Sequence, residues 1–385
     1  MKVVKIGIIG GGLMGKEAAS AFGRWFALND FPVKAELKAV CDLNPSVLDW
    51  FRQIPTVDLL TTNYKELLAD KAIDVVYIAV PHNLHKECYV DIIRAGKDLL
   101  GEKPFGIDLD CAIAIKKEAE KSGRFVRCSS EIPFLPGPQR VFEEVRSGRL
   151  GKIMDIKAGF LHSSDMNPSK AINWKRQSQY CGEIGVMGDL GMHALHIPLR
   201  LGWKPDLVFA QLQKIITKRP DGKGGSADAD TWNNATLSTR VNTGWDEDVP
   251  MTLEMKRLAP GETNTWYIEV LGTEGGVKYS TKDFKALWIY NWNEGKEQSW
   301  QRTDLGFQVP FPTITGGIFE PGFSDCFMQM LASYLAERED KLEGRFGCVT
   351  LSEAVESHQI FAAALASHQT GKAVKVGEIV EELSV

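Results

Sequence analysis

Solid apolar runs alternate with helix-like segments over the first 130 residues of the chain. The apolar runs are short and rich in β-branched residues, and the segments between them end at glycine, asparagine or proline. Strands are predicted at 3–9, 37–41, 74–80, 98–101 and 125–129, and helices at 14–28, 44–51, 64–69, 84–95 and 108–121. Strands buried on both faces give such uninterrupted apolar runs. The alternation therefore predicts an α/β domain with a parallel sheet over residues 1–130.

The pattern changes after about Gly151, where strand-like segments follow one another with little helix between them. Clusters of Gly, Asn, Asp and Pro separate the predicted strands at 153–161, 207–216, 235–241, 251–255, 266–271 and 286–292. Two predicted helices, 324–336 and 351–368, come next, and 374–376 returns to a sheet. This order predicts an α+β domain over residues 131–385 with a large, mostly antiparallel sheet. We expect its last helix to pack back on the first domain.

Composition narrows the class of protein. The chain of 385 residues has a formal net charge of −5, and it lacks the basic stripe of a nucleic-acid-binding protein. No apolar run reaches the roughly 18 residues of a membrane span. The apolar start enters a glycine turn without a cleavage site, which argues for a first strand and against a signal peptide. Seven scattered cysteines without a Cys-x-x-Cys pair predict free thiols in the reducing cytoplasm.

The first predicted strand runs directly into a glycine-rich turn of the form G-x-G-x-x-G. Gly10 permits the tight turn, Gly12 lets the backbone approach a pyrophosphate, and Gly15 lets the following helix pack closely on the strand. Leu13 and Met14 begin that helix, whose free N–H groups attract phosphate. The position between a strand and a helix predicts a Rossmann dinucleotide-binding domain. A plain glycine turn in an α/β fold is the alternative.

The same fingerprint needs an acidic residue at the end of the second strand, and Asp42 fits. It lies further from Gly15 than the usual ~20 residues, a difference that a longer first helix and a turn near Asn29 would absorb. A carboxylate there accepts hydrogen bonds from the adenosine ribose and repels a 2′-phosphate. Neither Leu43 nor Asn44 offers positive charge to hold such a phosphate. We therefore predict NAD as the cofactor in preference to NADP, with a helix cap as the alternative role of Asp42.

Three further motifs make the interpretation specific. They are Ala79-Val80-Pro81-His82-Asn83-Leu84-His85, Gly101-Glu102-Lys103-Pro104 and Gly188-Asp189-Leu190-Gly191-Met192-His193. Together with the glycine turn, they resemble the glucose–fructose oxidoreductase and inositol dehydrogenase family, known as Gfo/Idh/MocA. The resemblance covers the first 200 residues well, and the remainder mainly through the sheet pattern, the closing helix and Gly371.

The resemblance implies a set of functional residues. Lys103 would contact both the nicotinamide and the substrate, Asp189 and His193 would face the same pocket, and Trp174 would line the substrate site. The positions implied near the cofactor are Ala79, Pro81, His85, Glu102 and Lys103. Core packing for Trp174 and a surface helix position for His85 are the plainer alternatives.

The chemistry of these residue types agrees with those roles. Asp189 and His193 are four residues apart, so on a helix they share one face. Oxidation of an alcohol needs a base, and the unperturbed pKa of histidine suits that role near neutral pH. Lys103 would stabilise the developing alkoxide, and Asp189 would orient the histidine or bind a neighbouring hydroxyl. Helix capping by Asp189, a hydrogen-bonded core position for His193 and a strand cap at Lys103 are the alternatives.

The chain departs from the family pattern after its sixth strand. Glu131 stands where the family has an asparagine expected near the nicotinamide amide, and Pro133 replaces an arginine. Val80 stands before Pro81 where threonine is common. Contacts inherited at 131–136 are therefore in doubt, whereas the lysine, aspartate and histidine are unaffected.

These observations predict an NAD-dependent dehydrogenase that oxidises a secondary hydroxyl of a sugar, anhydrosugar or inositol-like polyol. The resemblance also implies a homodimer or homotetramer formed through the outer face of the C-terminal sheet. A glycoside hydrolase that retains NAD and a non-catalytic nucleotide sensor are alternatives. The histidines and cysteines show no convincing cluster of metal ligands, so no metal is expected.

Overall fold

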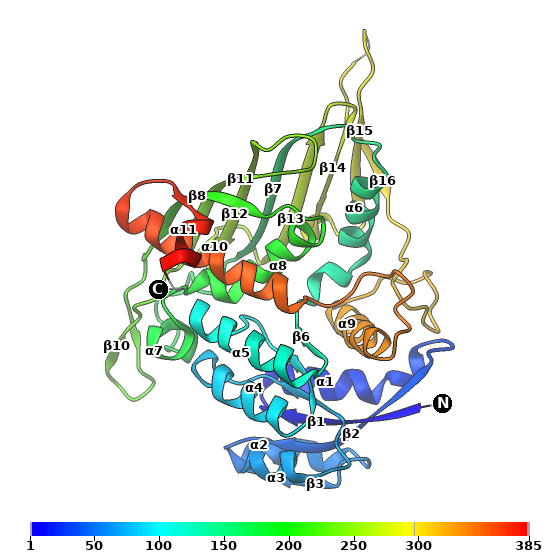
Figure 1. Cartoon of the computed structure of the whole chain (residues 1–385), viewed down its shortest axis with the longest axis vertical. Helices are drawn as coiled ribbons and strands as arrows, with labels where there is room; N and C mark the ends of the chain where they lie inside the picture. Colours follow the sequence, from blue (N-terminus) through cyan, green and yellow to red (C-terminus); the bar gives the residue numbers. More distant parts are fainter. Residues whose placement is uncertain (1, 296, 383–385) are drawn as a thin grey trace. The chain divides into compact units, whose positions relative to one another are not determined.

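A computed structural model describes residues 2–295 and 297–382 (Figure 1). The chain forms two compact units. The first comprises residues 2–106, 111–135 and 306–352, and the second comprises residues 107–110, 136–305 and 353–382. A segment from the last third of the chain thus belongs to the first unit, while the predicted division of function at residue 130 stays a prediction.

The first unit is built on a six-stranded sheet with the strand order β3-β2-β1-β4-β5-β6. All neighbouring strands are parallel, as the apolar runs predicted. The strands are β1 (Lys2–Ile9), β2 (Val33–Cys41), β3 (Leu59–Thr61), β4 (Val75–Ile78), β5 (Asp98–Gly101) and β6 (Val126–Cys128). The intervening α-helices are α1 (Leu13–Gly23), α2 (Pro45–Leu48), α3 (Tyr64–Ala69), α4 (His85–Arg94) and α5 (Leu109–Ser122). This strand order is that of the dinucleotide-binding Rossmann fold, so the predicted fold class is confirmed.

The first helix is shorter than its sequence pattern predicted. Helix α1 ends at Gly23, and a separate 3₁₀ turn, η1 (Trp25–Ala27), follows it. The Trp25 indole donates a hydrogen bond to the Val33 carbonyl at 2.8 Å, and its ring meets Phe31 edge to face. This tertiary contact turns the chain toward β2 earlier than an apolar helical pattern indicates. The long interval between Gly15 and Asp42 therefore comes from η1 and from a longer β2.

Helix α9 (Phe323–Arg338) joins the first unit from the C-terminal part of the chain and packs on α1. Arg127 of β6 pairs with Glu337 at 2.6 Å, and Arg338 pairs with Asp98 at 2.7 Å. The Ile314 amide donates to the Ala27 carbonyl at 2.9 Å, which fixes the preceding loop against η1.

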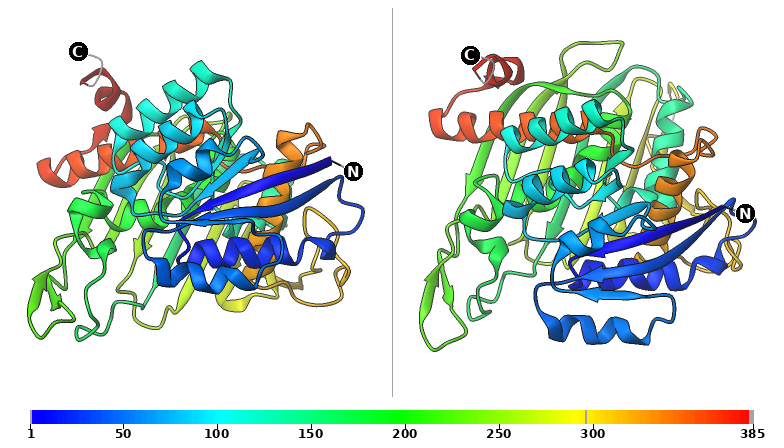
Figure 2. Two further views of the ribbon diagram at one scale, coloured as in Figure 1. Left: turned by 90° about the horizontal axis from the view of Figure 1, so that it is seen from below. Right: turned by 60° about the horizontal axis from the view of Figure 1, so that its bottom comes forward.

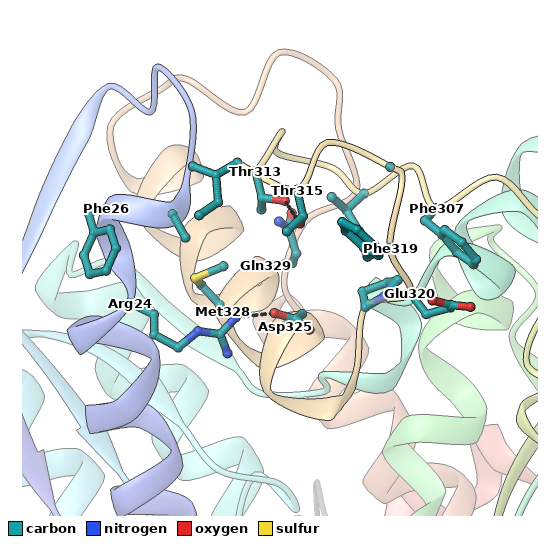
Figure 3. A pocket seen from close by; sticks show the side chains of 15 residues that line it. Arg24, Phe26, Phe307, Thr313, Thr315, Phe319, Glu320, Asp325, Met328 and Gln329 are labelled. Carbon is teal, nitrogen blue, oxygen red and sulfur yellow. Dashed lines mark hydrogen bonds and ion pairs between the residues drawn. The ribbon is translucent and has the colours of Figure 1, made fainter.

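A cavity of about 400 Å³ lies between η1 and this loop (Figure 3). Figure 3 shows an Arg24–Asp325 ion pair in the wall of this cavity, which Phe26, Phe307 and Phe319 also line.

The second unit is built on a nine-stranded sheet, whose strands lie side by side in Figure 2. Its order is β16-β15-β14-β13-β7-β12-β11-β8-β17, and β7 with β12 is its parallel pair among the described residues. The strands are β7 (Ile153–His162), β8 (Pro205–Gln213), β11 (Asn234–Val241), β12 (Val249–Lys256), β13 (Asn264–Gly272), β14 (Gly275–Ser280), β15 (Ala286–Asn291), β16 (Gln301–Asp304) and β17 (Val374–Lys375). A small hairpin of β9 (Lys218–Pro220) and β10 (Ser226–Asp228) stands apart. The predicted α+β class is confirmed.

Among the described residues, five α-helices accompany this sheet. They are α6 (Pro136–Arg146), α7 (Ser178–Cys181), α8 (Val186–Arg200), α10 (Leu351–Thr370) and α11 (Val376–Glu382). Helix α8 packs on β7 and β12 and is buried along almost its whole length. A Cβ atom at Gly191 would lie 2.4 Å from the Phe361 ring of α10, so glycine allows the two helices their close approach. In the part of the chain that the structure describes, no helix is long and apolar enough to cross a membrane.

Candidate active site

The glycine turn follows β1 and has little room for any other residue at two of its positions. Gly10 has a φ of 95°, and a Cβ there would lie 2.2 Å from the Ala79 carbonyl oxygen. A Cβ at Gly15 would lie 2.0 Å from the Gly10 carbonyl oxygen. Gly12, by contrast, is exposed, with nothing within 4 Å of its would-be Cβ. The turn therefore packs tightly at Gly10 and Gly15. It is open at Gly12, where we expect a ligand to come close to the backbone.

The N-terminus of α1 has the properties of a phosphate site. Its N-cap, Gly12, supplies no side-chain cap, and the first turn of the helix holds no acidic residue. Leu13 is 82% exposed and Met14 is half-buried. The free amide groups and the helix dipole at this end favour an anion.

Asp42 follows β2 at the edge of the same turn. Its Oδ2 accepts a hydrogen bond from the Gly11 amide at 2.8 Å, and its Oδ1 accepts one from the Asn44 amide at 2.8 Å. Helix α2 is capped by Asn44, whose Oδ1 accepts from the Ser46 amide at 3.1 Å, so Asp42 is not the cap of that helix. Leu43 beside it is 79% exposed. An open glycine, an uncapped helix and a carboxylate fixed beside them fit a dinucleotide with a free adenosine ribose.

His85 links the two loops that follow β4 and β5. Its Nδ1 lies 2.8 Å from the Pro104 carbonyl oxygen, and its Nε2 lies 3.0 Å from the Val80 carbonyl oxygen. The ring is fully buried and stacks on Tyr89 at 4.8 Å. Burial lowers the pKa of His85 to about 4, although both carbonyl contacts oppose that shift. The predicted cofactor residue His85 is thus a buried link between two loops, and in its neutral form only one ring nitrogen can donate to a carbonyl.

The loop that carries Lys103 is held by two tyrosines. The Tyr89 hydroxyl donates to the Glu102 carbonyl at 2.8 Å, and the buried Tyr77 hydroxyl donates to Glu102 Oε1 at 2.7 Å. Lys103 itself is half-buried, and its peptide bond to Pro104 is cis. Ala79 and Pro81, on the neighbouring loop, are both half-buried. The structure therefore gathers the residues predicted near the cofactor at the carboxyl ends of β1, β2, β4 and β5.

The position that departs from the family pattern lies at the end of β6. Glu131 is buried and immediately precedes a short 3₁₀ helix, η4 (Ile132–Phe134). Ser129, just before it, donates its amide hydrogen to the Gly101 carbonyl at 2.8 Å. A buried carboxylate thus occupies the place of the expected amide, two residues after the Ser129 amide that bonds the end of β5.

Asp189 and His193 both lie on α8 of the second unit, one turn apart, as predicted. The two residues are 7% and 2% exposed, respectively. The Trp266 indole donates to the His193 carbonyl at 2.8 Å, and the His193 ring meets Phe160 edge to face at 5.3 Å. Strands β7 and β13 therefore fix the turn of α8 that carries the histidine.

Two cations that the sequence interpretation missed hold the Asp189 carboxylate. Lys175 Nζ donates to Oδ1 at 2.8 Å, while Arg257 donates to Oδ2 from Nη2 at 2.8 Å and from Nε at 3.1 Å. Trp174 begins a short turn, η5 (Trp174–Arg176), and Lys175 Nζ lies 5.6 Å from the centre of its half-buried ring. Proximity to Trp174 was a weak signal for Lys175. No motif marks Arg257, which lies just after β12.

Nothing among the described residues groups three or more potential metal-ligating side chains. All seven cysteines are free, and six of them are buried. Burial raises the pKa of the Cys88 and Cys181 thiols to about 11.

Comparison with known proteins agrees with this geometry. Residues 4–130 match an oxidoreductase family with an NAD-binding Rossmann fold, and residues 139–278 match the GFO/IDH/MocA C-terminal domain. The chain is 24% identical over 295 residues to levoglucosan dehydrogenase of Pseudarthrobacter phenanthrenivorans, which covers 73% of this chain and 74% of that one.

A more distant relative is a glycosyl hydrolase family 109 protein of Shewanella pealeana. It is 26% identical over 171 residues, which cover 42% of this chain and 36% of that one.

A solved structure of levoglucosan dehydrogenase, in complex with NADH and L-sorbose, superposes with a TM-score of 0.87. The two chains are 21% identical, and the match covers 98% of this chain and 99% of that one. This likeness shows that the fold extends over both units. The chain belongs to the Gfo/Idh/MocA family of NAD-binding oxidoreductases.

Proposed function

We propose that this protein is an NAD-dependent dehydrogenase that oxidises a secondary hydroxyl of a sugar, an anhydrosugar or an inositol-like polyol. The observation that carries the proposal is the pair on α8, in which Asp189 is held by two cations one turn before the buried His193. An ionised carboxylate accepts hydrogen bonds, and a histidine takes up protons, so the pair suits a substrate with several hydroxyls. The relative solved with NADH and levoglucosan supports this substrate class.

The proposed roles follow from the chemistry of each side chain. His193 takes the proton of the reacting hydroxyl, and Lys103 stabilises the negative charge that develops on its oxygen. Asp189 accepts a hydrogen bond from a neighbouring hydroxyl, and Trp174 provides an apolar surface for the ring. NAD, when bound, supplies the acceptor for the hydride.

The cofactor contacts are proposed from the open turn and the loops beside it. Residues 1–130 would bind NAD, and residues 131–385 would bind the substrate and a partner subunit. The proposed contacts are Gly10, Gly12, Leu13, Met14, Gly15, Asp42, Leu43, Ala79, Pro81, Glu102 and Lys103. His85 would act through the backbone of the two loops that it joins.

The first test is NADH formation at 340 nm against a panel of free sugars, anhydrosugars, inositols and disaccharides, with NAD and NADP in parallel. A substrate-dependent rate with NAD supports the proposal and identifies the substrate. No rate with any panel member, from protein that binds NAD in a thermal-shift assay, would contradict it.

Two variants test the assigned roles. His193→Ala should lower kcat about 10²–10⁴-fold, the usual cost of removing a general base, while NAD affinity is kept. Lys103→Ala should be at least as damaging. His368→Ala is the matched control, because that histidine lies in the last turn of α10, where its ring packs against Trp232 and its Nδ1 accepts from the Leu212 amide at 3.4 Å. An unchanged kcat in either test variant would rule out the corresponding role.

A second candidate function is glycoside hydrolysis with retained NAD, which is favoured by the match to a glycosyl hydrolase. The distinguishing assay uses aryl glycosides. Release of the aryl alcohol without net NADH formation would favour the hydrolase, whereas accumulation of NADH from free polyols would favour the dehydrogenase.

The proposal extends to assembly and compartment. The outward face of the nine-stranded sheet carries half-exposed side chains such as Tyr267 and Trp288, which suit a contact with a second copy. A homodimer or homotetramer formed there should be visible by light scattering, and a monomer at micromolar concentration would contradict it. The seven free cysteines support a reducing compartment, the cytoplasm.

A further inference from the structure

Arg257 is a buried charged group beside α8 that is held by several hydrogen bonds. It is 1% exposed, and its guanidinium donates twice to Asp189 Oδ2 and once, at 3.3 Å, to the Lys175 carbonyl. Its own amide donates to the Asn233 carbonyl at 3.0 Å. Both the backbone and the side chain of Arg257 are therefore held before any ligand binds.

The surrounding strands continue this fixation. The Asn234 side chain bonds the backbone of Leu258 in both directions, donating from Nδ2 to the carbonyl and accepting from the amide, each at 3.1 Å. Residues on β11 thus lock the segment that leaves β12. Arg257 projects from this segment, and its guanidinium is held in turn by Asp189 and by the Lys175 carbonyl.

Lys175 and Arg257 act on different oxygens of the same carboxylate. Lys175 reaches Oδ1 from the 3₁₀ turn η5 with a side chain 35% exposed, whereas Arg257 reaches Oδ2 from the position just after β12. Two cations on one carboxylate favour its ionised form strongly. An ionised carboxylate only accepts hydrogen bonds, so this arrangement suits Asp189 to bind a hydroxyl and not to take up its proton.

We propose that Arg257 is a positioning residue for the substrate, which acts by holding Asp189 as a fixed hydrogen-bond acceptor. The inference rests on the proposed function, because it presumes that Asp189 contacts a polyol. The proposal gives the two residues of α8 separate roles. His193 exchanges the proton, whereas Asp189, fixed by Arg257, binds and orients a neighbouring hydroxyl. Loss of Arg257 should therefore weaken substrate binding more than it slows turnover.

The test compares Arg257→Met and Arg257→Lys with the wild-type enzyme, using the best substrate of the panel. Arg257→Met should raise KM about ten- to hundredfold, as expected for loss of a hydrogen bond to a charged group. Its kcat should fall less than KM rises, the reverse of His193→Ala. Arg257→Lys should recover part of the affinity, because lysine supplies the charge without the two-pronged geometry.

Two designs separate positioning from a general loss of structure. Arg200→Met is the matched control, since Arg200 makes a two-pronged pair from α8 to Glu353 at 2.6 and 2.9 Å, remote in the helix from Asp189. In an Asp189→Asn background, Arg257→Met should change KM little further, because Arg257 acts through Asp189. Circular dichroism and NAD binding verify that each variant is folded.

The outcomes are distinct. If the wild-type enzyme oxidises a polyol and folded Arg257→Met keeps its KM, the positioning role is overturned while the proposed function stands. The positioning role is also overturned if Arg257→Met raises KM as much in the Asp189→Asn background as in the wild-type enzyme. If the wild-type enzyme oxidises nothing in the panel, the proposed function fails, and this role fails with it.

Discussion

Replacing Asp42 with asparagine should weaken NAD binding about tenfold or more while leaving the fold intact. The carboxylate lies at the end of β2, where it accepts one hydrogen bond from Gly11 and one from Asn44, each at 2.8 Å. These two backbone donors fix its orientation beside the exposed Gly12. An asparagine has the same size and retains one acceptor oxygen, so the perturbation removes charge and one acceptor without creating a cavity.

The magnitude follows from the bonds that the carboxylate is placed to form. In this fold an acid here accepts hydrogen bonds from the adenosine ribose hydroxyls. A hydrogen bond to a charged group contributes about 1.5–3 kcal/mol, which corresponds to about 10- to 150-fold in Kd. The change also removes the repulsion of a 2′-phosphate, so the affinity for NADP should fall little or rise. The ratio of the NADP and NAD dissociation constants should therefore fall by at least about tenfold.

The assay is calorimetric titration of NAD and NADP into the wild-type protein and the variant. Asp49→Asn is the control, because Asp49 is an exposed carboxylate nearby in the chain that pairs with Arg52 at 3.0 Å. Thermal unfolding without ligand reports whether the turn survives. An NAD dissociation constant within twofold of wild type, in a variant that unfolds normally, would refute the reasoning about Asp42.

Three further predictions test the packing and the loops. Gly191→Ala should lower the free energy of unfolding by about 1–2 kcal/mol, because overpacking against Phe361 at 2.4 Å outweighs the gain in helix propensity. In a Phe361→Leu background the same change should stabilise the protein, and an equal loss in both backgrounds would contradict the close contact. Because burial lowers the pKa of His85 from 6.5 to about 4, the unfolded chain binds the extra proton first, and stability should fall by about 3 kcal/mol as the pH falls between those values. Denaturant titrations of His85→Gln should show that much less pH dependence, and an identical slope would rule out a buried neutral ring. Tyr89→Phe removes the hydroxyl that donates to the Glu102 carbonyl at 2.8 Å. It should lower the free energy of unfolding by about 1 kcal/mol and lower kcat more than it lowers NAD affinity. An unchanged kcat would show that this bond does not position Lys103.

The sequence was most informative where local chemistry decides the structure. The predicted strand 98–101 and helix 64–69 agree with β5 and α3 residue for residue. Their boundaries are set by neighbours in the chain: Asn63 caps α3 by accepting a hydrogen bond from the Lys65 amide at 3.1 Å. The glycine turn was predicted equally well, because the close contact that requires glycine at Gly15 lies within one strand–turn–helix unit.

Prediction failed where distant parts of the chain decide the outcome. The sequence pattern extends the first helix through residue 28, but the packing of Trp25 on Phe31 ends it at Gly23. No helix was predicted over 186–200, because nearly all residues of α8 are buried and its polar residues are confined to one narrow stripe of Asp189, His193, His196 and Arg200. The membership of residues 306–352 in the first unit depends on pairs such as Arg127 with Glu337, which no local pattern encodes.

The same distinction governs the candidate site. The Asp-x-x-x-His spacing predicts that two side chains share a helical face, but spacing alone does not say which of them exchanges a proton. That assignment depends on Lys175 and Arg257, which contact different oxygens of Asp189 from 14 and 68 residues away in the chain. Two cations favour the ionised carboxylate and suit it to bind a hydroxyl, so the mechanism proposed above assigns the proton exchange to His193. The motif thus predicts which groups react, whereas the ion pairs of Asp189 support the proposed assignment of a separate role to each.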